Sequence, residues 1–225
     1  MDKMIVYEDN VLLIIHKPAG IATQTSRIGQ ADMVSELKNY RKSKGENTYI
    51  GVIHRLDQPV EGLLVFAKNQ SAAEILSRQL QDNTLKKSYR ALVYGELAEN
   101  TGGTLIDFLQ KDNRTNLSKI VKESTGGAKK AVLDWKWVKT YQGKGCSMAE
   151  ITLLTGRHHQ IRVQMAGAAM PLLGDMKYGT DASKALSKQL GITNTALLAY
   201  KLALLHPKTG QYLEYRTDWK VPPIQ

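Results

Sequence analysis

The sequence contains very little cysteine. Cys146 is the single cysteine among 225 residues, which excludes an internal disulfide framework and leaves no thiolate cluster for a metal ion. This composition suits a reducing compartment, and we expect the protein in the cytoplasm.

Long apolar runs are also absent. No stretch reaches the roughly 18 apolar residues that a membrane-spanning helix needs. The first residues, MDKMIVYEDN, carry early acids where a secretory signal would have a basic end followed by an apolar run. We therefore expect a soluble protein with no membrane partner.

Several catalytic motifs are missing as well. The sequence has no glycine-rich phosphate loop of the Walker or dinucleotide type, and no serine within G-x-S-x-G. The adjacent His158 and His159 suggest a metal at first sight, but zinc ligands usually recur at i, i+4 or come with Cys or carboxylate partners. A metal-dependent hydrolase that also used His54 and His206 fails on this spacing, so hydrogen-bonding histidines are the better interpretation.

Positive charge is abundant. Lys and Arg number 31 against 21 Asp and Glu, which gives a formal net charge of +10. The charge favours a polyanionic partner such as nucleic acid. Solvated surface lysines explain the same composition, so charge alone leaves both interpretations open.

The hydrophobic pattern predicts an α+β fold with a mixed, largely antiparallel sheet and flanking helices, because strand-like segments follow one another without regular βα alternation. We expect one domain over residues 1–225, without repeats. The basic cluster RKSKG is interpreted as a solvated helix end rather than an RNA-binding arm, and STGGAKK as a surface loop. Turn residues Asp9 and Asn10 should separate two short strands. The other expected strands cover 62–68, 87–97, 131–141, 147–156 and a hairpin within 196–217, and the expected helices cover 32–45, 69–80 and 158–169.

The segment HRLDQPVEGLLVFAK places a carboxylate, Asp57, in a loop directly before a buried strand. A loop carboxylate on a rigid scaffold is well placed for chemistry. An ordinary surface ion pair between Asp57 and Arg55, worth about 0 to 1 kcal/mol, explains the same residues. Without further context the surface ion pair is the simpler interpretation.

Four motifs in addition to HRLDQPVEGLLVFAK supply this context. In chain order, YEDNVLLIIHKPAG, HRLDQPVEGLLVFAK, KSYRALVYG, LLTGRHHQIRVQMA and LLGDMKYG resemble the motifs of the RluA-type pseudouridine synthases. The resemblance implies the pseudouridine synthase catalytic fold. It also implies isomerisation of specific uridines in structured RNA, ribosomal or transfer RNA, with no cofactor and no metal.

The resemblance also implies roles for individual residues. Asp57 corresponds to the catalytic aspartate, which acts either as a nucleophile on the sugar or as a base; the sequence leaves both open. Tyr89 corresponds to a tyrosine that stacks on the target base, and Arg162 to the basic partner of the aspartate. Arg55 either enters the RNA helix where the base has left it or contacts a phosphate. Supporting roles fall to His54, Leu56, Gly62, Arg157 and Gln160.

The loop after the aspartate departs from the family pattern, which is close to R-D-T-S-G. Here the residues are Gln58, Pro59, Val60, Glu61 and Gly62, so only the glycine is kept. We expect no separate N-terminal RNA-binding domain, so that the catalytic domain of a monomer holds the RNA itself. A non-catalytic RNA-binding or ribosome-assembly factor with the same fold is the alternative function.

Overall fold

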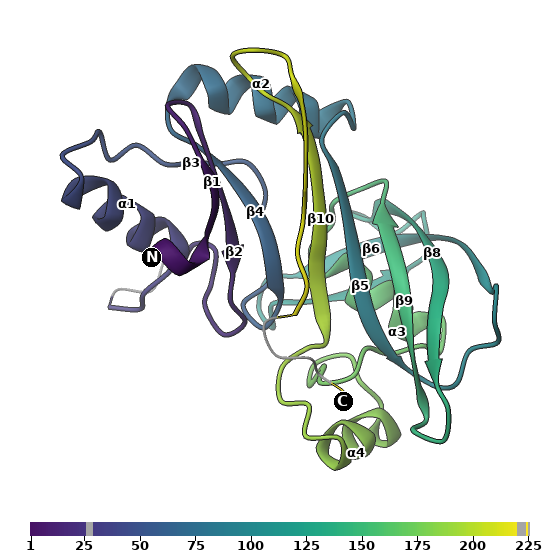
Figure 1. Ribbon diagram of the computed structural model, residues 1–225. Coiled ribbons are helices and arrows are strands. Elements are labelled where there is room, and N and C mark those ends of the chain that lie inside the picture. The colour runs from purple at the N-terminus through teal and green to yellow at the C-terminus, as the bar shows by residue number, and fades with distance from the viewer. Residues whose placement is uncertain (26–28, 220–223, 225) are drawn as a thin grey trace. The chain divides into compact units, whose positions relative to one another are not determined.

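A computed structural model of the chain describes residues 1–25, 29–219 and 224 (Figure 1). The chain divides into two compact units. The first consists of Met1–Lys87 and Leu198–Trp219, and the second contains Ser88–Leu197 together with Ile224. The expectation of one catalytic domain over the whole chain stays a prediction.

The first unit is built on a mixed sheet. Its strands follow the order β1, β2, β4, β10 and β11, and β3 also pairs with β4. The pairing between β4 and β10 is parallel, whereas the others are antiparallel. Figure 1 shows β1, β2, β4 and β10 in this arrangement. The strand bounds are Ile5–Glu8 for β1, Leu12–Lys17 for β2, Gly51–Val52 for β3, Glu61–Ala67 for β4, Leu197–Leu205 for β10 and Tyr212–Arg216 for β11.

Short-range signals in the sequence explain where these elements begin and end. The carboxylate of Asp9 accepts hydrogen bonds from the backbone N–H groups of Val11 and Leu12, which closes the expected turn between β1 and β2. Helices α1 (Met33–Ser43) and α2 (Gln70–Gln81) start after the N-caps Asp32 and Asn69. A 3₁₀ turn, η1 (Asp2–Met4), precedes β1. The predicted strands and helices of this unit are confirmed.

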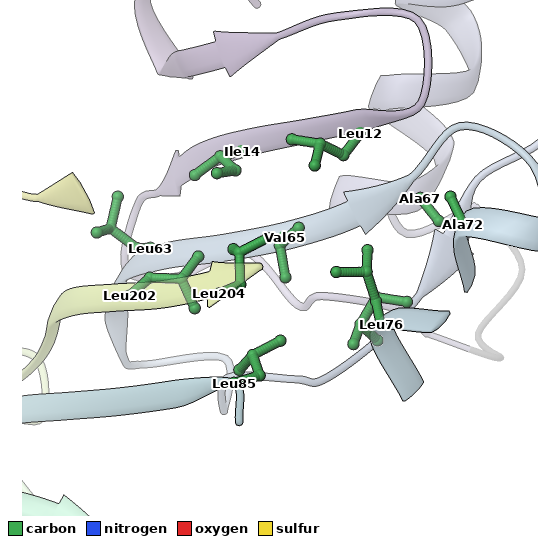
Figure 2. Packing of buried hydrophobic residues seen from close by; sticks show 11 residues of the cluster. Leu12, Ile14, Leu63, Val65, Ala67, Ala72, Leu76, Leu85, Leu202 and Leu204 are labelled. Atoms are coloured by element: carbon green, nitrogen blue, oxygen red, sulfur yellow. The ribbon is translucent and has the colours of Figure 1, made fainter. Parts of the chain in front are cut away.

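The core of the first unit lies between the sheet and α2 (Figure 2). Helix α2 contributes Ala72 and Leu76, which lie one turn apart and therefore share a face. Their partners come from alternate positions of β2, β4 and β10, whose side chains point to the same side of the sheet. The other core residues are Leu12, Ile14, Ile53, Leu63, Val65, Ala67, Leu85, Leu202 and Leu204.

The basic cluster at the end of α1 is a solvated helix end except at its first residue, because Lys42 and Lys44 are exposed but Arg41 is not. Arg41 is buried, and its Nη1 donates to the carbonyls of Tyr49 and Lys68 at 2.6 and 3.1 Å. Its Nε also contacts Glu46 at 3.2 Å. The long side chain reaches past its own helix to Tyr49 in the following loop and to Lys68 after β4, so burial is stabilised by hydrogen bonds that helical periodicity does not reveal.

The second unit carries an antiparallel sheet in the order β5, β9, β8, β6 and β7. Helix α3 (Gln160–Gly167) packs Val163 against Leu109 and Ala131 of this sheet. A second cluster includes Leu92, Cys146 and Leu173. The strand bounds are Lys86–Tyr94 for β5, Gly102–Asp112 for β6, Leu117–Val121 for β7, Lys129–Tyr141 for β8 and Cys146–Leu153 for β9.

The α+β fold class with a largely antiparallel sheet is confirmed, but several elements were not predicted. These are β3, β6, β7 and the helix α4 (Asp181–Gln189). The expected loop STGGAKK is also shorter than predicted, because Lys129 and Lys130 already belong to β8. No helix in the described part of the chain is long and apolar enough to cross a membrane.

The backbone at Gly62, the first glycine after Asp57, requires glycine. Its φ is +125°, and a Cβ atom there would lie 2.4 Å from the carbonyl oxygen of Ala199, its parallel partner in β10. Only glycine permits both this backbone conformation and this close approach of two strands.

We therefore expect Gly62→Ala to lower the free energy of unfolding by about 2–4 kcal/mol, measured by urea denaturation. Gly103→Ala is the matched control, because Gly103 also lies in a strand but its Cβ would meet no atom closer than 3.8 Å. Equal losses in the two variants would contradict the steric explanation.

Candidate active site

Asp57 lies in the loop that connects β3 to β4 and is half-buried. The backbone on its N-terminal side is fixed by Thr23, whose hydroxyl both donates to the carbonyl of Leu56 and accepts from its N–H. On the other side, Gly20 and Gln58 exchange two hydrogen bonds. The loop is therefore held to the segment 20–23 on both sides of the carboxylate.

Lys17 lies beneath this loop and is fully buried. Its ammonium group donates to the carbonyls of Pro18, Ile21 and Gln58 at 2.9, 2.8 and 3.3 Å. Burial lowers the pKa of Lys17 to about 8, although the charges of the nearby carboxylates Asp57 and Glu61 act in the opposite direction.

Lys17 lies in the motif HKPAG, but no role was predicted for it from the sequence. A charged residue at the end of the otherwise apolar strand LLIIHK is the signal that could have found it. The pattern cannot reveal that the ammonium group joins the KPAG turn to the Asp57 loop, because its acceptor on Gln58 lies 41 residues away.

We expect Lys17→Met to loosen the Asp57 loop, because the carbonyls of Pro18, Ile21 and Gln58 lose their common donor. Hydrogen exchange over residues 56–60 should accelerate, and the free energy of unfolding should fall by about 1–3 kcal/mol. Lys3→Met is the control, since Lys3 is exposed and should change neither quantity. Unchanged exchange in Lys17→Met would contradict this role.

The other residues predicted in this loop occupy contrasting environments. Arg55 is exposed, whereas His54 and Leu56 are buried. An exposed arginine beside a held carboxylate can reach a polyanion in solution. The buried Leu56 side chain anchors the loop backbone while Asp57 stays half-exposed, and its supporting role stays a prediction.

In the second unit, Gln160 and Arg157 support the start of α3. Gln160 Oε1 accepts from the backbone N–H of Arg157 at 2.9 Å and from the Thr155 hydroxyl at 2.8 Å, and its Nε2 donates to the carbonyl of Val132. Arg157 Nε donates to the carbonyl of Lys130 at 2.8 Å. These contacts join the helix to β8.

Arg162 forms a buried bidentate ion pair with Asp175. Nε and Nη2 of Arg162 each lie 2.7 Å from one carboxylate oxygen. The N–H groups of Lys177 and Tyr178 donate to the same carboxylate. Burial acts to raise the pKa of Asp175, but the Arg162 guanidinium and these N–H groups lower it below its usual value. The orientation of the guanidinium is thereby fixed.

The adjacent histidines belong to a hydrogen-bonded cluster, as expected. His159 Nδ1 lies 2.6 Å from the hydroxyl of Tyr178, which also accepts from the N–H of Ser118. His158 Nδ1 lies 2.9 Å from the Ser118 hydroxyl, and the two imidazole rings stack at 3.7 Å. Across the described residues, no group of three or more His, Cys, Asp or Glu side chains is arranged to hold a metal ion.

His159 has a φ of +54°, in the left-handed region that non-glycine residues rarely adopt. It stands directly before α3, so this strained backbone sets the direction in which the helix leaves. Tyr178 and Asp175 both come from LLGDMKYG. This motif contributed to the family resemblance, but none of its residues was predicted to belong to the site. In the structure, Tyr178 contacts the ring of His159 and Asp175 binds the guanidinium of Arg162.

Tyr89 lies on β5 opposite Ile151 of β9 and is buried. It belongs with Arg162 to the second unit, whereas Asp57 and Arg55 belong to the first. The pairing of Arg162 with Asp57 therefore stays a prediction.

The sequence of this chain matches a known family. Residues 11–167 match the family described as RNA pseudouridylate synthase. This range includes the Asp57 loop, Tyr89 and Arg162. The chain belongs to the RNA pseudouridylate synthase family, and the resemblance drawn from the motifs is confirmed.

Individual relatives agree with this assignment. The chain is 38% identical over 93% of its length to a Bacillus subtilis protein named uncharacterized RNA pseudouridine synthase YhcT, and spans 66% of that relative. It is 32% identical over 95% of its length to ribosomal large subunit pseudouridine synthase C of Pasteurella multocida, of which it spans 63%. The chain thus spans less than two thirds of these curated relatives.

A solved structure supports the fold. The structure of human RNA pseudouridylate synthase domain containing 1 matches with a TM-score of 0.77 and 24% identity, and the match covers 99% of this chain and 86% of that chain. At this identity the likeness concerns the fold.

Proposed function

We propose that this protein isomerises specific uridines in structured RNA to pseudouridine, with Asp57 as the catalytic carboxylate. The observation that carries the proposal is the Asp57 loop. Its backbone is held on both sides by hydrogen bonds to the segment 20–23, while the carboxylate itself is half-exposed. Membership of the RNA pseudouridylate synthase family supports the reaction type.

The reaction requires that the base be detached from the sugar, turned and rejoined through carbon. A carboxylate serves this reaction as a nucleophile or as a base, and both roles need an oxygen held at a fixed position. The contacts of Lys17 and Thr23 supply that rigidity for Asp57. The two roles of the carboxylate stay open.

We assign substrate-binding roles to three further residues. Tyr89 is assigned to stacking on the target base from its place in the motif KSYRALVYG, a contact that contributes about 1–3 kcal/mol per base. Arg162 offers a guanidinium whose orientation is set by Asp175. Arg55 is exposed and contacts the RNA as a replacement for the flipped base or through a phosphate.

Ribosomal RNA is the first substrate to test, because a close relative is named for the ribosomal large subunit. The net charge of +10 supports a polyanionic substrate such as RNA. Transfer RNA is the second candidate. A cytoplasmic location and a monomeric state stay predictions.

Position-resolved mapping of pseudouridine in total RNA, from cells with and without this protein, tests the proposal. We expect the modification to disappear at one or a few uridines and to return when the wild-type protein is restored. Identical maps, together with RNA binding by the purified protein, would favour the alternative of a non-catalytic RNA-binding or ribosome-assembly factor.

A further inference from the structure

Tyr178 gives the buried Arg162 a second contact besides its ion pair with Asp175. The carboxylate of Asp175 binds the edge of the guanidinium that is formed by Nε and Nη2, at 2.7 Å from each nitrogen. Cζ of Arg162 also lies over the ring of Tyr178, 5.1 Å from the ring centroid. This distance is typical of a cation–π contact, which is stronger where the cation is shielded from water.

The ring of Tyr178 is itself held in place. Its hydroxyl accepts from the N–H of Ser118 at 2.9 Å and lies 2.6 Å from Nδ1 of His159. The ring meets the imidazole of His159 edge to face, with 5.5 Å between the centroids. Three apolar side chains pack around it, namely Leu109, Ala131 and Val163. Contacts from β6, β7, β8 and α3 therefore set the position of the ring.

The ion pair with Asp175 leaves one movement of the guanidinium open. Two parallel hydrogen bonds fix which edge of the guanidinium faces the carboxylate. A hinge movement about the line through the two carboxylate oxygens keeps both N···O distances, however, so the pair alone does not fix the tilt of the guanidinium plane. A contact outside this line, such as the ring of Tyr178, does so.

We propose that Tyr178 is a positioning residue of Arg162, which fixes the tilt of the guanidinium and so directs its other edge to the reacting nucleotide. The inference rests on the proposed function, in which Arg162 belongs to the substrate-binding site. Tyr178 acts through Arg162 and does not itself contact the RNA. The motif LLGDMKYG supplies both groups that orient Arg162, since Asp175 and Tyr178 belong to it.

Tyr178→Leu, which removes the ring, tests the proposal in single-turnover measurements of pseudouridine formation at limiting and at saturating RNA. At saturating RNA the rate should fall at least about tenfold, because a displaced guanidinium disturbs the geometry of the reacting groups. The RNA concentration for half the maximal rate should change less than about threefold, since many other contacts share the binding of RNA. A wild-type rate in Tyr178→Leu would overturn the proposal.

Tyr178→Phe is the conservative variant. It keeps the ring and its apolar neighbours, so the rate at saturating RNA should stay within about threefold of wild type. A loss as large as that in Tyr178→Leu would show that the ring is not what positions Arg162 and would overturn the proposal.

Tyr141→Leu is the matched control, because Tyr141 is also half-buried in the second unit and makes a cation–π contact of 4.9 Å with Lys139. Both leucine variants should lower Tm, since each loses a packed ring. Only Tyr178→Leu should slow the reaction. Equal rates in the two leucine variants would show that Tyr178 supports the fold alone.

The Nε–H group of Arg162 gives a readout that needs no RNA. Its NMR signal, assigned by its disappearance in Arg162→Lys, should exchange slowly with solvent in wild type, because the group is buried and bonded to Asp175. Exchange should be at least about tenfold faster in Tyr178→Leu and unchanged in Tyr178→Phe and Tyr141→Leu. Slow exchange in Tyr178→Leu would overturn the proposal.

The two readouts separate this inference from the proposed function. Faster exchange of the Arg162 signal in Tyr178→Leu, without any isomerisation of RNA by wild type, would support the positioning of Arg162 and contradict the function. Isomerisation by wild type and by Tyr178→Leu at the same rate would overturn the inference and leave the function standing.

Discussion

Asp57→Asn is expected to reduce pseudouridine formation by at least about 1,000-fold, because the amide keeps the size of the side chain but is neither a nucleophile nor a base. The fold should survive, since the loop is held through the N–H of Leu56 and the carbonyl of Gln58 rather than through the carboxylate alone. Single-turnover measurement on ribosomal RNA provides the rate, and a binding assay on the same RNA should show an affinity close to that of wild type.

Asp181→Asn is the matched control for this loss, because Asp181 is an exposed aspartate at the start of α4. The control should isomerise RNA within about twofold of the wild-type rate. A wild-type rate in Asp57→Asn would remove Asp57 from the reaction. A loss in both variants would point to a general effect of lost negative charge.

Asp175→Asn is expected to give the largest loss of stability among the charged residues considered. The substitution removes the carboxylate that holds two nitrogens of the buried Arg162 guanidinium. Loss of one partner from a buried ion pair costs about 3–5 kcal/mol. For a chain of this size that corresponds to a decrease in Tm of about 10 °C, measured by calorimetry.

The dependence on pH gives this prediction a second readout. The pKa of Asp175 is lowered in the folded protein, so its stabilisation is present above the pKa of about 3.9 in the unfolded chain and is lost as pH falls through the lower folded value. The difference in stability between wild type and Asp175→Asn should therefore be full near pH 7 and should shrink in strong acid.

Lys136→Ala is the control, because the Lys136–Glu150 pair has a similar length of 3.0 Å but an exposed lysine. Exposed pairs contribute about 0–1 kcal/mol, so the control should hardly change Tm. The double variant Arg162→Met with Asp175→Leu should be more stable than Asp175→Asn, since no buried charge is left without its partner. Equal effects of Asp175→Asn and Lys136→Ala would contradict the importance of the buried pair.

Local signals determined the parts of the fold that the sequence predicted correctly. Asp9 closes a turn through N–H groups two and three residues away, and Asn69 caps α2 through the N–H of Ala72. The apolar strand β4 is buried along nearly its whole length. In each case the decisive interaction, or the decisive hydrophobic pattern, lies within a few residues of one segment.

The missed elements lack such a pattern. Helix α4 has the sequence DASKALSKQ, and its buried residues are Ser183 and Ser187. The hydroxyl of Ser187 accepts from the N–H of Gly174 and donates to the carbonyl of Ser183. Strand β6 has Leu109 as its single buried residue and pairs with β8 and β7 on its two edges. Burial of hydroxyls and pairing of exposed strands depend on neighbours that periodicity does not identify.

For the candidate site, the sequence alone identified the family and the residues Asp57, Tyr89 and Arg162 through their ordered motifs. The tertiary structure decided how the residues are held. Lys17 reaches the carbonyl of Gln58 and Arg162 reaches Asp175. A motif records which side chains are present. Whether a buried charge finds an acceptor depends on backbone groups brought together from distant positions, and only the folded chain fixes those distances.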